Sequence, residues 1–144
     1  MYLVKNEYDT DDRVVREDSY FIPNEFDNEG WHEYTMLEYY EDGKLYKESV
    51  YSQESNTDGT YMLEQYSIWE YDAGGALASQ TQYSADGLVL GRGTYENGNT
   101  KEFIWFNEDG TIASSEDYVY DASGNFIYSL ETDSEGNIRR MQSD

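Results

Sequence analysis

Hydrophobic and polar residues follow one another in short runs along this chain, and turn residues interrupt the runs at regular intervals. The runs are rich in aromatic and β-branched residues, as in 66–71, 101–106, 118–120 and 126–130. Segments of this composition favour β-strands. No stretch has the sustained period of an amphipathic helix. The pattern therefore predicts an all-β protein.

The interruptions share a form in which an acidic residue, Asn or Ser is followed by Gly. These glycines are Gly30, Gly43, Gly59, Gly75, Gly87, Gly98, Gly110, Gly124 and Gly136, and Asp12 stands where an earlier copy would have its glycine. In such a turn the side-chain oxygen accepts backbone N–H groups two residues on, and Gly takes the positive φ that closes a bulged hairpin. The spacing predicts one strand and one turn per repeat.

Strands joined by short turns run antiparallel, so we expect a meander of about ten short strands within one domain, residues 1–144. Apolar residues stand on both parities of a strand, as Tyr34 and Met36 do against Leu37 and Tyr39. Both faces of the sheet should then be partly covered, either by curling toward a barrel or by long side chains that lie on a bare face. A three-lobed arrangement would need twelve strands.

Composition leaves open whether the chain is ordered. Leu, Ile, Val and Phe together make up only 25 of the 144 residues, which at high net charge is typical of disorder. Against this stand 16 Tyr, 3 Trp and a single Pro. Disordered chains are poor in aromatic residues and rich in Pro. We therefore expect a folded chain in which aromatic rings supply the missing core.

The charge indicates which partners suit the chain. The formal net charge is -22, from 31 acidic and 9 basic residues. This charge repels nucleic acid and anionic lipid, and it attracts basic protein surfaces. No segment is apolar enough for membrane insertion, and without Cys there are no disulfides or thiolate metal sites. We expect a protein or carbohydrate ligand, with a basic protein surface favoured.

Candidate chemistry is sparse. His32 is the single imidazole, and one His on a strand is typically a cross-strand or surface residue. Acidic pairs are too abundant to indicate glycoside hydrolysis. The EF-hand template fails at Gly110 and at Gly136, although weak calcium binding stays open. The segments 91–93 and 97–99 are interpreted as turn or bulge residues. We predict no catalytic, cofactor or metal site, and no enzyme.

Aromatic residues are the remaining candidates for a binding site. Trp31, Trp69 and Trp105 recur at intervals of 38 and 36 residues, which indicates duplication of a unit of about three strands. One interpretation is that these rings form the core. The other is that they form a rigid face, bordered by acids, that stacks on sugars or holds a basic protein. The candidate binding residues are Trp31, Trp69, Tyr71, Trp105, Tyr118 and Tyr120.

The turns resemble those of the YD-repeat family of Rhs-type and other bacterial surface or secreted proteins. The matching stretches are 71–75 and 120–125 and, more loosely, Tyr8-Asp9, Phe26-Asp27, Tyr83-Ser84 and Tyr95-Glu96. Residues 40–48, followed by Tyr51, are similar to MORN-like variants found among antitoxin components. Both resemblances imply noncatalytic β-hairpin repeats. Basic residues near the turns, usual in YD repeats, are here limited to Arg13, Lys44 and Arg139.

Two functions follow as expectations. The first is a noncatalytic acidic β-repeat module that binds another macromolecule as part of a bacterial surface or secreted protein. The second is a free-standing acidic inhibitor, such as an immunity protein, an antitoxin or a nucleic-acid mimic, that binds a basic protein. The first favours a location outside the cell or at its surface.

Overall fold

The computed structural model describes residues 2–21, 30–55 and 61–142. Within these residues, one repeated set of local hydrogen bonds closes the turns. Asp72 Oδ1 accepts the N–H groups of Gly74 and Ala76 at 2.8 and 3.0 Å. Gly75 N donates to Asp72 O at 2.9 Å, and Gly75 has a φ of 90°. The predicted turn chemistry is confirmed here.

The same backbone bond closes six more turns in the described chain. They are the turns 9–12, 40–43, 84–87, 107–110, 121–124 and 133–136. Asp12 has a φ of 59°, so it occupies the predicted glycine position. Asn97 and Gly98, with φ of 52° and 80°, form a tighter two-residue turn between Glu96 and Asn99. The predicted turn at Gly59 and the Phe26-Asp27 match lie outside the described residues.

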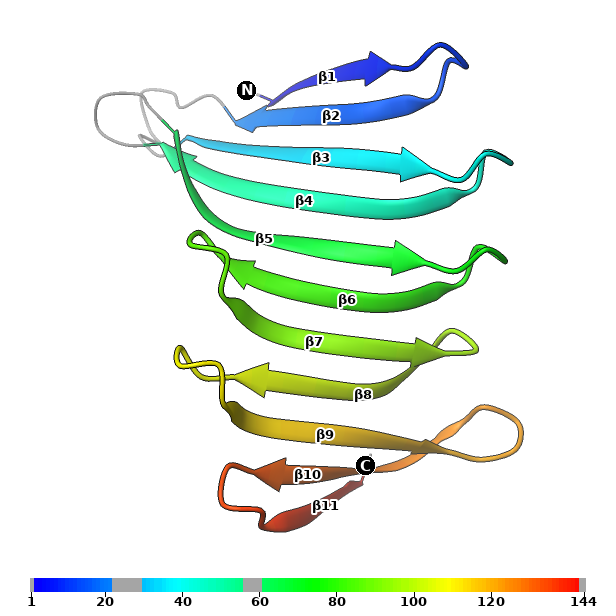
Figure 1. Ribbon diagram of the computed structural model, residues 1–144, viewed down its shortest axis with the longest axis vertical. Helices are drawn as coiled ribbons and strands as arrows, with labels where there is room; N and C mark the ends of the chain where they lie inside the picture. The colour runs from blue at the N-terminus through cyan, green and yellow to red at the C-terminus, as the bar shows by residue number, and fades with distance from the viewer. Residues whose placement is uncertain (1, 22–29, 56–60, 143–144) are drawn as a thin grey trace.

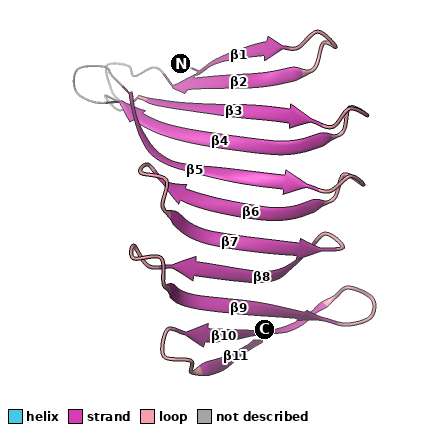
Figure 2. Cartoon of the chain, viewed as in Figure 1, coloured by secondary structure: helices cyan, strands magenta, loops and turns pink. Residues whose placement is uncertain are grey.

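The described strands form one 11-stranded antiparallel sheet in which every strand pairs with its neighbours in sequence (Figure 1 and Figure 2). The strands are β1 (Tyr2–Tyr8), β2 (Val14–Phe21), β3 (Trp31–Tyr39), β4 (Leu45–Ser55), β5 (Tyr61–Tyr71), β6 (Leu77–Ser84), β7 (Val89–Glu96), β8 (Asn99–Phe106), β9 (Ile112–Tyr120), β10 (Phe126–Asp133) and β11 (Ile138–Gln142). The all-β meander is confirmed. β1 and β11 are its two edges, so the sheet is open and the barrel-like alternative is not observed.

No helix in the described part of the chain is long and apolar enough to cross a membrane.

A β-bulge follows most turns. Glu7 pairs with Arg16 and Tyr8 with Val14, which leaves Val15 as an extra residue in β2. The corresponding extra residues are Tyr46, Glu64, Ala78, Leu90, Lys101, Ala113 and Ile127. A bulge bends its strand and increases the local twist. The long sheet is thus bent at both ends of its strands.

The sheet is a single layer, and the described residues contain no buried apolar side chain. The buried side chains are polar: Asp18, His32, Ser49, Thr81 and Ser129. The chain exposes 9758 Å², whereas a compact monomer of this mass exposes about 7,700 Å². The expectation of an aromatic core is therefore wrong. The rings lie side by side on the surface of the sheet and cover one another only in part.

One face carries a ladder of stacked tyrosine rings. Tyr34, Tyr51, Tyr66 and Tyr83 are successive cross-strand partners from β3 to β6. Their ring centroids are 4.6, 5.1 and 4.7 Å apart, and the rings are within 22° of parallel. We call this face the ladder face. Stacked aromatic pairs stabilise a sheet beyond the area they bury, so the ladder replaces part of the missing interior.

Tyrosine hydroxyls also join one hairpin to the next. Tyr39 donates to Val14 O at 2.7 Å, Tyr40 to Tyr71 O at 2.9 Å, and Tyr120 to Thr100 O at 2.7 Å. Each accepting carbonyl lies beside a turn or bulge, where the regular ladder of backbone bonds is interrupted.

Candidate functional site

The three tryptophans share the face opposite the ladder. Successive residues of a strand alternate between the two faces, and paired residues share a face. Trp31 therefore lies on the other face of β3 from Tyr34, and Trp69 on the other face of β5 from Tyr66. Trp105 pairs with Gly91, which pairs with Gln82, an immediate neighbour of Tyr83. The register therefore carries all three rings to the face that does not hold the ladder.

Each tryptophan has a glutamate as a neighbour on this face. Glu48 is the direct cross-strand partner of Trp69. Glu33 lies two residues after Trp31 in β3, and Glu116 lies two residues after Ser114, the partner of Trp105. We call this surface the acidic aromatic face, defined by Trp31, Glu33, Glu48, Trp69, Trp105 and Glu116.

Charge is divided unequally between the two faces of the described strands. The basic residues in regular pairs on the ladder face are Lys5, Arg16, Lys47, Arg92 and Arg140, and acids of the same face surround them. On the acidic aromatic face the corresponding basic residue is Arg139, at the edge of the sheet, where it pairs with Glu131. The side chains of Glu17 and Glu33 form no ion pair or hydrogen bond among the described residues. Uncompensated negative charge therefore accumulates on the tryptophan side.

Tyr71 and Tyr118 lie on the same face and bond its glutamates. Tyr71 OH donates to Glu48 Oε2 at 3.5 Å, and Tyr118 OH donates to Glu116 Oε2 at 2.8 Å. Burial, with a smaller contribution from Glu116, raises the pKa of Tyr118 to about 12. Burial likewise raises the pKa of Tyr71. Both phenols are thus neutral donors near neutral pH and hold the carboxylates in place.

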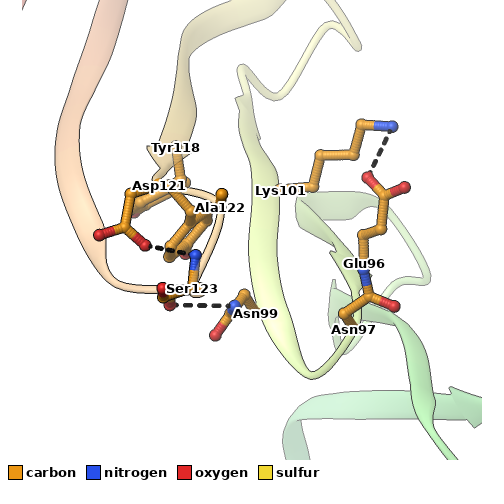
Figure 3. A pocket seen from close by; sticks show the side chains of 10 residues that line it. Glu96, Asn97, Asn99, Lys101, Tyr118, Asp121, Ala122 and Ser123 are labelled. Carbon is orange, nitrogen blue, oxygen red and sulfur yellow. Dashed lines mark hydrogen bonds and ion pairs between the residues drawn. The ribbon is translucent and has the colours of Figure 1, made fainter.

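A cavity of about 600 Å³ opens beside Tyr118 and Tyr120, between the tip of the β7–β8 hairpin and the 121–124 turn (Figure 3). Lys101 Nζ lies 3.4 Å from Glu96 Oε2 on one side of it. On the other side Asp121 Oδ1 accepts Ser123 N at 2.8 Å, and Asn99 Nδ2 donates to Gly124 O at 3.4 Å. The cavity combines ring surface with amide and charged groups.

The six predicted binding residues all lie on the acidic aromatic face, but they do not form one cluster. Trp31 packs against Tyr2, with ring centroids 5.6 Å apart, and Trp105 against Phe103 at 4.4 Å. Only Tyr118 and Tyr120 among them line the described cavity. From β3 to β9 the residues span roughly 30 Å at the usual strand spacing. This extent suits a macromolecular surface better than a small ligand.

Neither the tyrosine ladder nor a polar network beside it is evident from the sequence. Arg16 Nε donates to Asp18 Oδ2 at 2.7 Å, and His32 Nε2 lies 2.8 Å from Asp18 Oδ1. His32 Nδ1 lies 2.8 Å from Gln53 Oε1, and the ring stacks on Tyr20 with centroids 4.2 Å apart. The histidine is thus a buried cross-strand residue, as its isolation in the sequence predicted.

The prediction that 91–93 are turn or bulge residues holds only in part. Gly91 adjoins the bulge at Leu90, whereas Gly93 is a regularly paired residue of β7, and the ring of Phe103 lies against both. A β-carbon at Gly91 would lie 2.9 Å from Phe103 Cε1. These glycines therefore make room for a ring.

The carboxylates of the turns accept hydrogen bonds from backbone N–H groups of the same turn. Asp109 Oδ1 accepts Thr111 N at 2.9 Å, and Asp133 Oδ1 accepts Glu135 N at 2.9 Å. Hydrogen bonds from Thr111 and Asn137, respectively, lower the pKa of Asp109 and Asp133. Within the described ranges no group of three or more His, Cys, Asp or Glu is arranged to hold a metal ion.

Comparisons with known proteins give no family for this chain. No protein-family model matches it, and no curated protein does. Among solved structures it is similar to a protein of unknown function from Bacteroides fragilis, with 11% identity, a TM-score of 0.35, and coverage of 99% of this chain and 92% of that one. It is also similar to a porin-like protein from Bacteroides uniformis, with 10% identity, a TM-score of 0.23, and coverage of 95% and 86%.

Proposed function

We propose that this chain is a noncatalytic module that binds another macromolecule, a protein with a basic surface, through the acidic aromatic face. The observation that carries the proposal is the placement of the three tryptophans and their glutamate neighbours on one face, while most basic side chains of the strands lie on the other. Tryptophan and tyrosine are among the residues that dominate the binding energy of protein interfaces, and complementary charge around them steers the partner.

The geometry favours a protein over a sugar. Glu33 and Glu48 lie beside Trp31 and Trp69 on this face, and a net charge of -22 steers a basic partner toward it. A neutral oligosaccharide would gain from the rings but nothing from these charges. The YD-like turns at 71–75 and 120–125 support assigning the module to a bacterial surface or secreted protein.

The same face supports the second candidate, a free-standing acidic inhibitor. Its target would be a basic protein whose own active or binding surface the acidic aromatic face covers. The excess of negative charge on one side favours this function equally well, because it provides electrostatic steering to a single surface.

A matched pair of charge variants tests the proposal. Glu33 lies on the acidic aromatic face and Glu102 on the ladder face, and neither forms an ion pair among the described residues. With lysozyme as a basic probe protein, Glu33→Gln should weaken binding by about 2- to 5-fold, in line with one partly exposed charge contact. Glu102→Gln should leave the affinity unchanged.

Trp69→Ala extends the test to the rings and should weaken lysozyme binding further. Equal losses for Glu33→Gln and Glu102→Gln would show that net charge alone attracts the probe, and would overturn the assignment of the face. Binding of neutral oligosaccharides that depends on Trp69 but not on salt would replace the basic protein with a carbohydrate.

A further inference from the structure

The edge strand β1 is open to pairing. All seven of its residues are exposed, and four of them are large apolar residues. Tyr2, Leu3, Val4 and Tyr8 are 67%, 41%, 56% and 59% exposed. An exposed apolar edge is a template for another strand, and natural sheets usually protect such edges with charge or Pro. β11, the other edge, is five residues long and its two charges, Arg139 and Arg140, have the same sign, whereas the charges of β1, Lys5 and Glu7, are opposite in sign.

The charges of β1 and β2 alternate on the ladder face. Lys5 is paired with Asp18, and Glu7 with Arg16. Each charge of β1 on this face therefore has a charge of the other sign as its cross-strand partner in β2, and Lys5 and Glu7 form the outer row. Among the described strands, none lies beyond this outer row.

We propose that β1 pairs antiparallel with β1 of a second copy of this chain, with Asn6 opposite Asn6. In this register Lys5 lies opposite the partner copy's Glu7, and Val4 opposite its Tyr8. The alternation of charge then continues across the junction, from Arg16 and Glu7 of one copy to Lys5 and Asp18 of the second copy. Opposite charges directly across a pair of strands stabilise it, as do apolar pairs.

Neighbouring registers lack this complementarity. A shift of one residue in each copy sets Lys5 opposite Lys5, and a shift the other way sets Glu7 opposite Glu7. Pairing of β11 with itself, centred on Arg139 or on Arg140, sets like charges opposite each other. Pairing of β1 with β11 can set Glu7 opposite Arg140 on the ladder face, but Lys5 then faces the uncharged Ile138 or Gln142, and Arg139 on the other face also lies opposite an uncharged residue.

The arrangement extends the proposed function without depending on it. A two-fold axis perpendicular to the sheet relates the copies, so both acidic aromatic faces point the same way. A partner with repeated basic surfaces would then be held by two modules at once, which raises its effective affinity.

Charge exchange tests the pairing. Sedimentation equilibrium of the 144-residue chain should show a reversible dimer between micromolar and millimolar concentration. Lys5→Glu and Glu7→Lys should each weaken it about tenfold, because each sets two like-charged pairs across the junction. An equimolar mixture of the two variants should restore dimerisation, since each acidic side chain of the Lys5→Glu copy then faces a basic side chain of the Glu7→Lys copy.

Matched controls separate this effect from net charge and from folding. Lys44→Glu and Glu108→Lys make the same changes in charge within exposed turns away from β1, and they should leave the dimer unchanged. Circular dichroism should confirm that every variant is folded. A chain that is monomeric throughout the range would overturn the proposal. So would single variants that dimerise like the parent, a mixture that fails to recover, or a dimer weakened instead by Arg140→Glu.

Discussion

Phe103 covers Gly93, its direct cross-strand partner, so that a β-carbon on this glycine would stand 3.0 Å from the ring carbon Cδ2. Gly93→Ala should therefore destabilise the sheet by about 1–3 kcal/mol, the usual cost of forcing an extra carbon into an occupied site. Urea unfolding followed by circular dichroism measures the change.

The matching control removes the ring. In the Phe103→Ala background the added methyl group has space, so the further cost of Gly93→Ala should fall to a fraction of its value in the parent chain. Additive losses would show that the glycine is needed for its backbone freedom and not for the ring.

Asp12 occupies a left-handed conformation that its counterparts in other turns fill with Gly. Asp12→Gly should raise the free energy of unfolding by up to about 1 kcal/mol, because the β-carbon strain of a non-glycine residue is removed. Asp86 precedes its turn glycine and is not in the left-handed region. Asp86→Gly should give no gain, and an equal gain at both positions would contradict the explanation.

The tyrosine ladder should be sensitive to loss of a ring but not of a hydroxyl. Tyr66 stacks between Tyr51 and Tyr83. Tyr66→Ala should cost at least about 1–3 kcal/mol from two ring pairs, whereas Tyr66→Phe should be nearly neutral. Near-ultraviolet circular dichroism should report the lost stacking. If Tyr8→Ala, at a ring that is 59% exposed, costs as much, the ladder is not a distinct source of stability.

Acid should selectively weaken the network around Asp18. Hydrogen bonding from Arg16, and next from His32, lowers the pKa of Asp18 from 3.8 to about 2. The folded state therefore favours the ionised carboxylate. This contribution, at most about 2 kcal/mol, is present above about pH 4 and is lost as the pH falls through about 2.

Asp18→Asn isolates that contribution. The variant should be less stable than the parent at neutral pH, and the difference should shrink as the pH approaches 2. Urea unfolding of both proteins across this range measures it. A difference that stays constant with pH would show that the carboxylate acts through packing alone.

Local rules made the fold predictable, but long-range relationships between side chains were harder to recognise. Turn chemistry depends on adjacent residues, so Asp72 and Gly75 predicted their hairpin, and the same logic assigned Asp12 correctly. The tyrosine ladder depends on register. Its trace in the sequence is that Tyr34 and Tyr51 lie nine residues before and eight after Gly43, as Tyr66 and Tyr83 do around Gly75.

The candidate site was predictable only in part. The period of the tryptophans predicted a recurring unit of about three strands. The structure puts Trp31, Trp69 and Trp105 on one face, but in β3, β5 and β8, which are two and three strands apart. Their relation to Glu48 and Glu116 follows from strand pairing, which composition does not reveal. The interpretation of the rings as a core failed because a single-layer sheet has no interior to enclose them.

Because each described strand is hydrogen-bonded only to its neighbours in sequence, a contact broken in one hairpin can propagate only through the adjoining ones. Loosening should begin at the two outer hairpins and advance inward, so amide hydrogen exchange should be slowest in the middle strands and faster toward both ends. Thermal unfolding should then be multistate, with the outer hairpins melting before the middle strands, instead of a single cooperative transition.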